Sequence, residues 1–83
     1  MDYQLINERF GAEIRQLRLK RGLTQAELAG MAGITRQKLI EIEKGHGTVA
    51  LNFYTRVIAS LEGELQVVPA QLPTLDDIRG LFE

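Results

Sequence analysis

The most constraining feature of this 83-residue sequence is a stretch over residues 25–44, QAELAGMAGITRQKLIEIEK. It has the pattern of two short helices joined by a tight turn. Gly33 lies where a left-handed backbone is wanted, Thr24 and Glu27 form a T-x-x-E capping box, and Thr35 can cap the second helix. Two helices this small bury little surface. Their usual purpose is to hold the second helix where it can enter a DNA groove, so the pattern predicts a DNA-binding unit.

Helices are expected on both sides of this unit. Residues 7–21 place Phe10, Ile14 and Leu17 on one face behind a possible Asn7 cap. A further helix over residues 51–61 carries an apolar stripe at helical spacing. The stripe consists of Leu51, Tyr54, Val57, Ile58 and Leu61.

The remaining sequence predicts two short elements. Residues 64–68 alternate and are β-branched before Pro69, which favours a strand, and residues 75–82 favour a short helix. The predicted organisation is a helical DNA-binding domain over residues 1–61, a dimerising strand over 62–69, and a short C-terminal helix or tail over 70–83.

Composition excludes several classes of protein. The length allows one compact domain, which buries only about 60% of its unfolded surface. Absence of cysteine excludes disulfides and thiolate metal sites and fits a reducing cytoplasm. No apolar run reaches the roughly 20 residues needed to cross a bilayer. Residues 1–45 carry eight Lys/Arg against six Asp/Glu, and residues 46–83 carry two against five. A weakly basic front half and an acidic tail suit local phosphate contact.

The sequence offers no catalytic site. His46 is the single histidine, and it stands in a glycine-flanked loop. There is no Gly-rich phosphate loop, and no nucleophile has an evident base. We therefore expect no enzyme activity, no metal and no cofactor.

The two-helix unit resembles the helix-turn-helix of the Xre or lambda-repressor-like family. The resemblance covers about residues 10–61 and is carried by Ala29, Gly33, the capped helix starts and the flanking helices. It implies an all-α, lambda-repressor-like domain of four to five helices. It also implies roles for individual side chains. By this resemblance, the residues that read bases are Arg36, Gln37 and Glu41. The residues that contact phosphates are Thr24, Gln25, Thr35, Lys38 and Lys44. Arg18 and Glu43 form a structural ion pair.

A helical projection of residues 36–44 is compatible with these roles but leaves alternatives open. It turns Leu39 and Ile42 inward and Gln37, Ile40, Glu41 and Lys44 outward, with Arg36 and Lys38 on the flanks. Arginine pairs with guanine, glutamine with adenine, and glutamate accepts from cytosine.

Each reader also has an ordinary alternative. The alternative for Arg36 and Gln37 is that they are ordinary solvated residues. The alternative for Gln25 is that it only begins a helix, and for Glu41 that its carboxylate is repelled by the phosphates. Ile40 touches either a thymine methyl group or a protein partner.

The predicted strand has no mate elsewhere in the chain. A lone strand leaves its backbone amides and carbonyls unpaired, and pairing with the same segment of a second copy is the economical solution. DNA half-sites about 34 Å apart also require a two-fold dimer. We therefore predict a homodimer through Glu64, Leu65, Gln66, Val67 and Val68. The alternative is that this segment packs back on the helix over residues 51–61.

Helices followed directly by a dimerising strand resemble the HipB-type antitoxins, on the segment IASLEGELQVV. This resemblance implies a homodimeric repressor of its own operon that also binds a toxin kinase. The expected function is thus a cytoplasmic, sequence-specific DNA-binding repressor acting on an inverted repeat, as an autoregulatory antitoxin. The alternative is a protein-interaction module that neutralises or recruits a partner protein, with DNA binding secondary.

Overall fold

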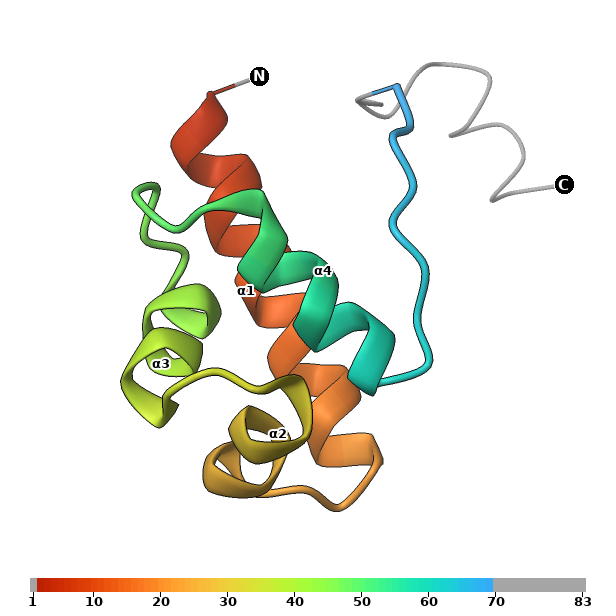
Figure 1. Cartoon of the computed structure of the whole chain (residues 1–83). Coiled ribbons are helices and arrows are strands. Elements are labelled where there is room, and N and C mark those ends of the chain that lie inside the picture. Colours follow the sequence, from red (N-terminus) through yellow and green to blue (C-terminus); the bar gives the residue numbers. More distant parts are fainter. Residues whose placement is uncertain (1, 70–83) are drawn as a thin grey trace, which may run out of the picture.

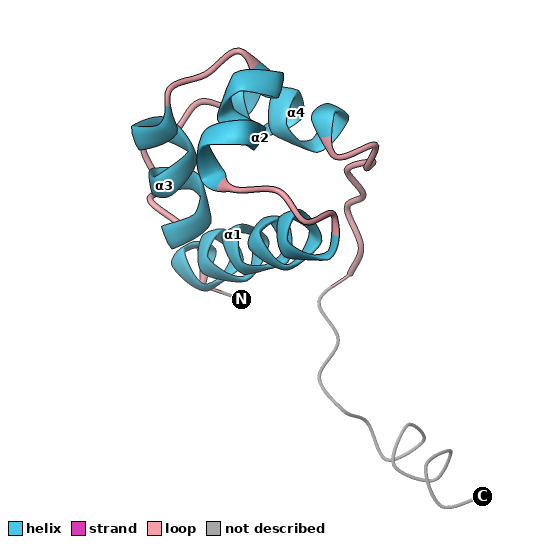
Figure 2. Cartoon of the chain, turned by 90° about the horizontal axis from the view of Figure 1, so that it is seen from below, coloured by secondary structure: helices cyan, strands magenta, loops and turns pink. Residues whose placement is uncertain are grey.

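The computed structural model describes residues 2–69 of the chain and contains four helices in that range (Figure 1). They are α1 (Tyr3–Lys20), α2 (Gln25–Ala32), α3 (Arg36–Lys44) and α4 (Leu51–Ser60). All regular secondary structure in residues 2–69 is helical (Figure 2). The prediction of an all-α helix-turn-helix domain is confirmed for these residues.

The first helix is longer than the sequence predicted. The prediction that Asn7 caps it was wrong, because Asp2 is the cap and its side chain accepts a hydrogen bond from the Gln4 amide at 3.1 Å. The additional turn is supported from outside the helix. The Gln4 side-chain amide donates to the carbonyl oxygen of Gly45, which ends α3, at 3.2 Å.

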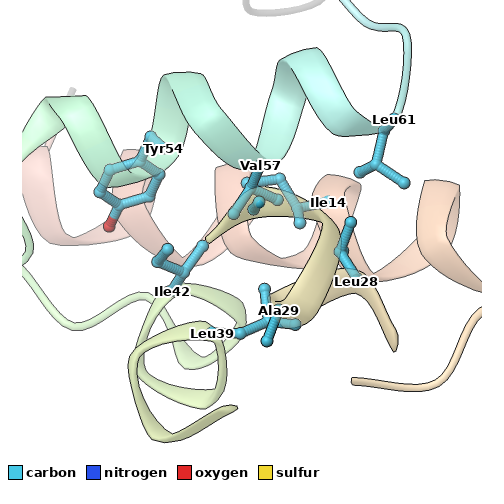
Figure 3. Close-up of a cluster of buried hydrophobic side chains, with 9 residues drawn as sticks. Ile14, Leu28, Ala29, Leu39, Ile42, Tyr54, Val57 and Leu61 are labelled. Carbon is cyan, nitrogen blue, oxygen red and sulfur yellow. The ribbon is translucent and has the colours of Figure 1, made fainter. Parts of the chain in front are cut away.

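The core lies where α2 meets α3 and α4. Leu28, Leu39, Ile42 and Val57 are completely buried there (Figure 3). Burial of each such side chain contributes about 1.5–3 kcal/mol, so these contacts hold two short helices that would be marginal alone. The phenyl ring of Phe10 stacks on Tyr54 at 5.3 Å and joins α1 to α4.

Gly11 lets α1 approach α3 closely. It is buried, and a Cβ at this position would overlap the carbonyl oxygen of Ile42 and lie 2.7 Å from that of Glu43. No side chain fits between the two backbones. Gly11 therefore sets the distance from α1 to α3.

The chain leaves α4 through Glu62, which adopts the left-handed conformation with φ of 58°. Residues 63–69 then run in an extended conformation beside the domain (Figure 1). Within this described segment no strand is formed, and pairing of residues 64–68 with a second copy stays a prediction. The predicted C-terminal helix over residues 75–82 lies outside the described residues.

Candidate nucleic-acid interface

The turn between α2 and α3 fixes how α3 is presented. Gly33 ends α2 with φ of 69°, and the Ile34 amide donates to the carbonyl oxygen of Ala29 at 3.0 Å. Ala29 is only 3% exposed, so a larger side chain there would push α3 away. As a result α3 lies at the outer edge of the domain (Figure 1, Figure 2).

The outer side of α3 carries the predicted readers. Leu39 and Ile42 are completely buried, which turns the opposite side of the helix to solvent. Arg36 and Gln37, in the first turn, are exposed. Lys44 is exposed at the other end, whereas Ile40 and Glu41 are half-buried. Two of the three predicted base readers are thus exposed.

Arg36 is also linked to the interior of the domain by a chain of polar contacts. Its guanidinium donates to the side-chain oxygen of Gln25 at 3.4 Å, and the Gln25 side-chain amide donates to Glu43 at 3.3 Å. Both polar atoms of the Gln25 side chain are therefore hydrogen-bonded, which fixes the orientation of its amide group. The contact limits the freedom of Arg36 at the position where a base edge would meet it.

These polar contacts, from Arg36 through Gln25 to Glu43, end at a buried ion pair between Glu43 and Arg18. Arg18 donates to both carboxylate oxygens of Glu43, at 2.8 and 3.1 Å. The two side chains are only 8% and 3% exposed. A third guanidinium nitrogen donates to the carbonyl oxygen of Leu23 at 2.9 Å. The structure brings together the two residues that the resemblance paired, and they join α1 and α3 with the loop before α2.

The N-termini of α2 and α3 carry the predicted phosphate contacts Thr24 and Thr35. Each hydroxyl accepts a capping hydrogen bond, from the Glu27 amide at 3.1 Å and from the Lys38 amide at 3.0 Å. The Thr35 hydroxyl keeps its own O–H as a donor, and the amides at both helix starts add partial positive charge. These two helix starts can therefore accept a phosphate oxygen.

The first of these caps holds a carboxylate. The Thr24 amide donates to Glu27 at 3.0 Å. This backbone hydrogen bond, with a smaller contribution from the Thr24 hydroxyl, lowers the pKa of Glu27 below its ordinary value. Glu27 therefore stays charged and closes the capping box.

Two other predicted contacts meet each other instead of facing outward. The Lys38 ammonium lies 3.3 Å from the Glu41 carboxylate and 5.2 Å from the centroid of the Phe53 ring on α4. The sequence reading missed Phe53. An aromatic residue in the first turn of α4 offers no signal of its own, because the partner lies on another helix.

A groove of about 720 Å³ lies on the side of α1 that faces the extended segment. Its apolar wall includes Ile6 and Phe10 from α1 and Leu65 and Val68 from residues 64–69. Val67, which also lines it, is 96% exposed. The predicted dimer segment thus forms one wall of an open, partly apolar groove.

Within residues 2–69, no helix is long and apolar enough to cross a bilayer.

Comparison with known proteins agrees with this geometry. Residues 9–62 match the family model described as a helix-turn-helix domain, which is more than half of the chain. The chain is also similar to a protein of Methanothermobacter thermautotrophicus named as an uncharacterized HTH-type transcriptional regulator. The two are 43% identical over 51 residues, which covers 61% of this chain and 74% of that protein. With a buried small residue before the turn, a left-handed glycine in it and an exposed α3, the chain belongs to the Xre-like helix-turn-helix family.

Proposed function

We propose that this protein is a sequence-specific DNA-binding transcriptional regulator that inserts α3 into the major groove. The observation that carries the proposal is the exposure of Arg36 and Gln37 in the first turn of α3. Arginine can donate to both major-groove acceptors of guanine, and glutamine can bond both edge atoms of adenine. The capped starts of α2 and α3 would position the domain on the phosphates.

The proposed active form is a homodimer that binds an inverted repeat and acts as a repressor. A two-fold axis is needed because half-sites lie one helical turn, about 34 Å, apart. The groove beside α1 is the site where we propose that the second copy binds. Its walls are α1 and residues 64–69, and Ile6, Phe10, Leu65 and Val68 make it partly apolar.

In this arrangement the segment 64–68 of each copy would enter the groove of the other. It would pair with the unpaired edge of the same segment and cover Ile6, which is 49% exposed, and Val67. Each strand would then lie between the partner's strand and the partner's α1. The energy would come from covering these apolar side chains and satisfying the strand edges.

A selection of random duplexes by the purified full-length protein tests the proposal. We expect enrichment of one site with two-fold symmetry and half-sites separated by one turn of the duplex. Enrichment of an asymmetric site would contradict the homodimer but not DNA reading. Recovery of no sequence preference would contradict the whole proposal.

A second candidate function is that of an antitoxin, in which the protein binds a toxin kinase and represses their shared operon. The supporting observation is the unusual exposure of apolar residues after α4, where Val67 is 96% and Val68 70% exposed. Such residues favour a protein partner. Pull-down from the native host with the full chain would recover a kinase under this hypothesis. Recovery of the chain alone, together with a symmetric DNA site, would leave the simple regulator.

A further inference from the structure

Lys38 differs from the other basic side chains of α3 in where its charge lies. Its side chain is 33% exposed and its ammonium is 3.3 Å from the Glu41 carboxylate, which is itself 28% exposed. The same ammonium lies 5.2 Å from the centroid of the Phe53 ring. Arg36 and Lys44, by contrast, are exposed.

The two contacts act on the same cation and differ in kind. The carboxylate neutralises the charge, and the face of an aromatic ring attracts an ammonium without adding a charge of its own. An exposed i,i+3 ion pair alone contributes little. Together with the ring on α4, it gives the ammonium a defined place on the side of α3 that leans toward α4.

This placement matters because sequence-independent DNA binding depends on lysine and arginine at phosphates. Each phosphate contact releases counterions and steepens the dependence of affinity on salt. A lysine held by a carboxylate makes no such contribution. An unpaired carboxylate in its place would be repelled by the duplex, so the pair also makes Glu41 tolerable near DNA.

We infer that Glu41 and Phe53 together withhold Lys38 from the DNA phosphates, and that Glu41 is thereby a specificity-determining residue. This inference rests on the proposed DNA-binding function. Glu41 lowers binding to unrelated sequences more than binding to the preferred site, because the preferred site is also held by base contacts that do not depend on Lys38. It assigns Lys38 and Glu41 roles other than the phosphate contact and base readout predicted from the sequence.

The test measures affinity against salt concentration for four full-length proteins on a random-sequence duplex and on the selected site. They are the wild type, Lys38→Met, Glu41→Gln and the double variant. Methionine keeps an unbranched side chain on Phe53 without the charge. We expect Lys38→Met not to steepen the dependence of log affinity on log salt, because it leaves the Glu41 carboxylate unpaired. Glu41→Gln should steepen it by about 0.9 per copy, or about 1.8 per dimer, as the freed ammonium reaches a phosphate.

The double variant separates release of Lys38 from simple loss of repulsion. The inference requires its slope to return to the wild-type value. If the double variant keeps the full gain of Glu41→Gln, the effect comes from the carboxylate alone and the inference is wrong. A slope for the double variant about 0.9 per copy below that of the wild type would also overturn it, because Lys38 would then already contact phosphate in the wild type.

A measurement without DNA keeps this inference separate from the proposed function. The ε-methylene protons of Lys38 should resonate upfield of those of Lys20 and Lys44, because the ammonium bonded to that methylene lies over the Phe53 ring, 5.2 Å from its centroid. Glu41→Gln should move them back toward the other two lysines. An ordinary shift for Lys38 in the wild-type protein would show that the ammonium is not held. Absence of any DNA binding would instead contradict the proposed function, and the proton shifts would then report only whether Glu41 and Phe53 hold the ammonium.

Discussion

The Arg36 side chain is exposed to solvent and is also held in place by a hydrogen bond to Gln25. It is exposed, yet its guanidinium donates to Gln25, whose own amide donates to the buried Glu43. A side chain held from behind loses less rotamer entropy when it binds. The orientation of Arg36 therefore depends on Gln25 and, through it, on Glu43.

Replacing Arg36 by alanine should lower affinity for the selected site by about 1–3 kcal/mol and relax the preference at one base pair, because a bidentate guanine contact is lost. The measurement is binding to the selected site and to its single-base-pair variants. Equal weakening on every duplex would identify Arg36 as a phosphate contact. Arg56, on the exposed side of α4, provides the matched control, and its replacement by alanine should leave the base preference unchanged.

The Arg18–Glu43 pair makes a second prediction about a single residue. Glu43→Gln removes the charge partner of an arginine whose side chain is only 8% exposed and should lower the free energy of unfolding by about 3–5 kcal/mol. Arg21→Ala is the control. It removes an exposed pair with Glu62, with side chains 43% and 78% exposed, and should cost at most about 1 kcal/mol. Urea denaturation measures both, and equal losses would contradict the assignment of Arg18–Glu43 as the structural pair.

Between elements, the separation of α1 and α3 depends on Gly11. Alanine there would gain about 1 kcal/mol of helix propensity but would force two backbones apart, an overpacking cost of about 1–3 kcal/mol. The overlap with the carbonyl oxygens of Ile42 and Glu43 makes the upper part of that range the expectation. We therefore expect Gly11→Ala to lower the melting temperature.

The matched control is Gly30→Ala in α2. Nothing lies within 4 Å of a Cβ built at Gly30, so the propensity gain of about 1 kcal/mol should appear as added stability. Opposite signs for the two variants test the close approach directly. Stabilisation by both would contradict it.

The start of α2 predicts a pH dependence. Because its folded pKa is lowered, the Glu27 carboxylate stabilises the fold above its ordinary pKa of about 4.5, and this contribution is lost as pH falls through the folded value. Glu27→Gln keeps a capping side chain without the charge. The difference in unfolding free energy between wild type and Glu27→Gln should thus shrink from about pH 6 to about pH 3. A difference that does not change with pH would contradict a charged capping box.

At the scale of the whole molecule, the prediction concerns assembly. Val67→Asp places a charge on a side chain that is 96% exposed in the single chain and should leave the fold intact while dissociating the proposed dimer. Sedimentation analysis would show a dimer for the wild type and a monomer for the variant. DNA binding to the symmetric site should fall with it. Met31→Asp, on a 56% exposed side chain of α2, is the control for charge and should stay dimeric. A dimeric Val67→Asp would place the interface elsewhere.

Local sequence was sufficient wherever the responsible forces act within a few residues. Thr24 and Thr35 cap the helices that the sequence predicted, and Gly33 ends α2 at positive φ, because these caps and this left-handed glycine depend on the adjacent backbone alone. The apolar spacing likewise predicted the burial of Leu39 and Ile42 and the exposure of Gln37 and Lys44 on the opposite side of α3.

Only the tertiary structure decided which distant groups meet. The helix α1 begins after Asp2 and not after Asn7 as predicted, and its first turn is held by the Gln4 hydrogen bond to Gly45. Position 11 requires glycine because α1 lies against the backbone of α3 there. The tertiary structure also placed Lys38 between Glu41 and the Phe53 ring of α4. Periodicity shows that a side chain leaves one face of a helix but not what it meets there, because the partner belongs to another element. In this protein, the sequence by itself determined that these helices form and that α3 has an outward face, and tertiary packing decided which charges on that face are paired and which are exposed.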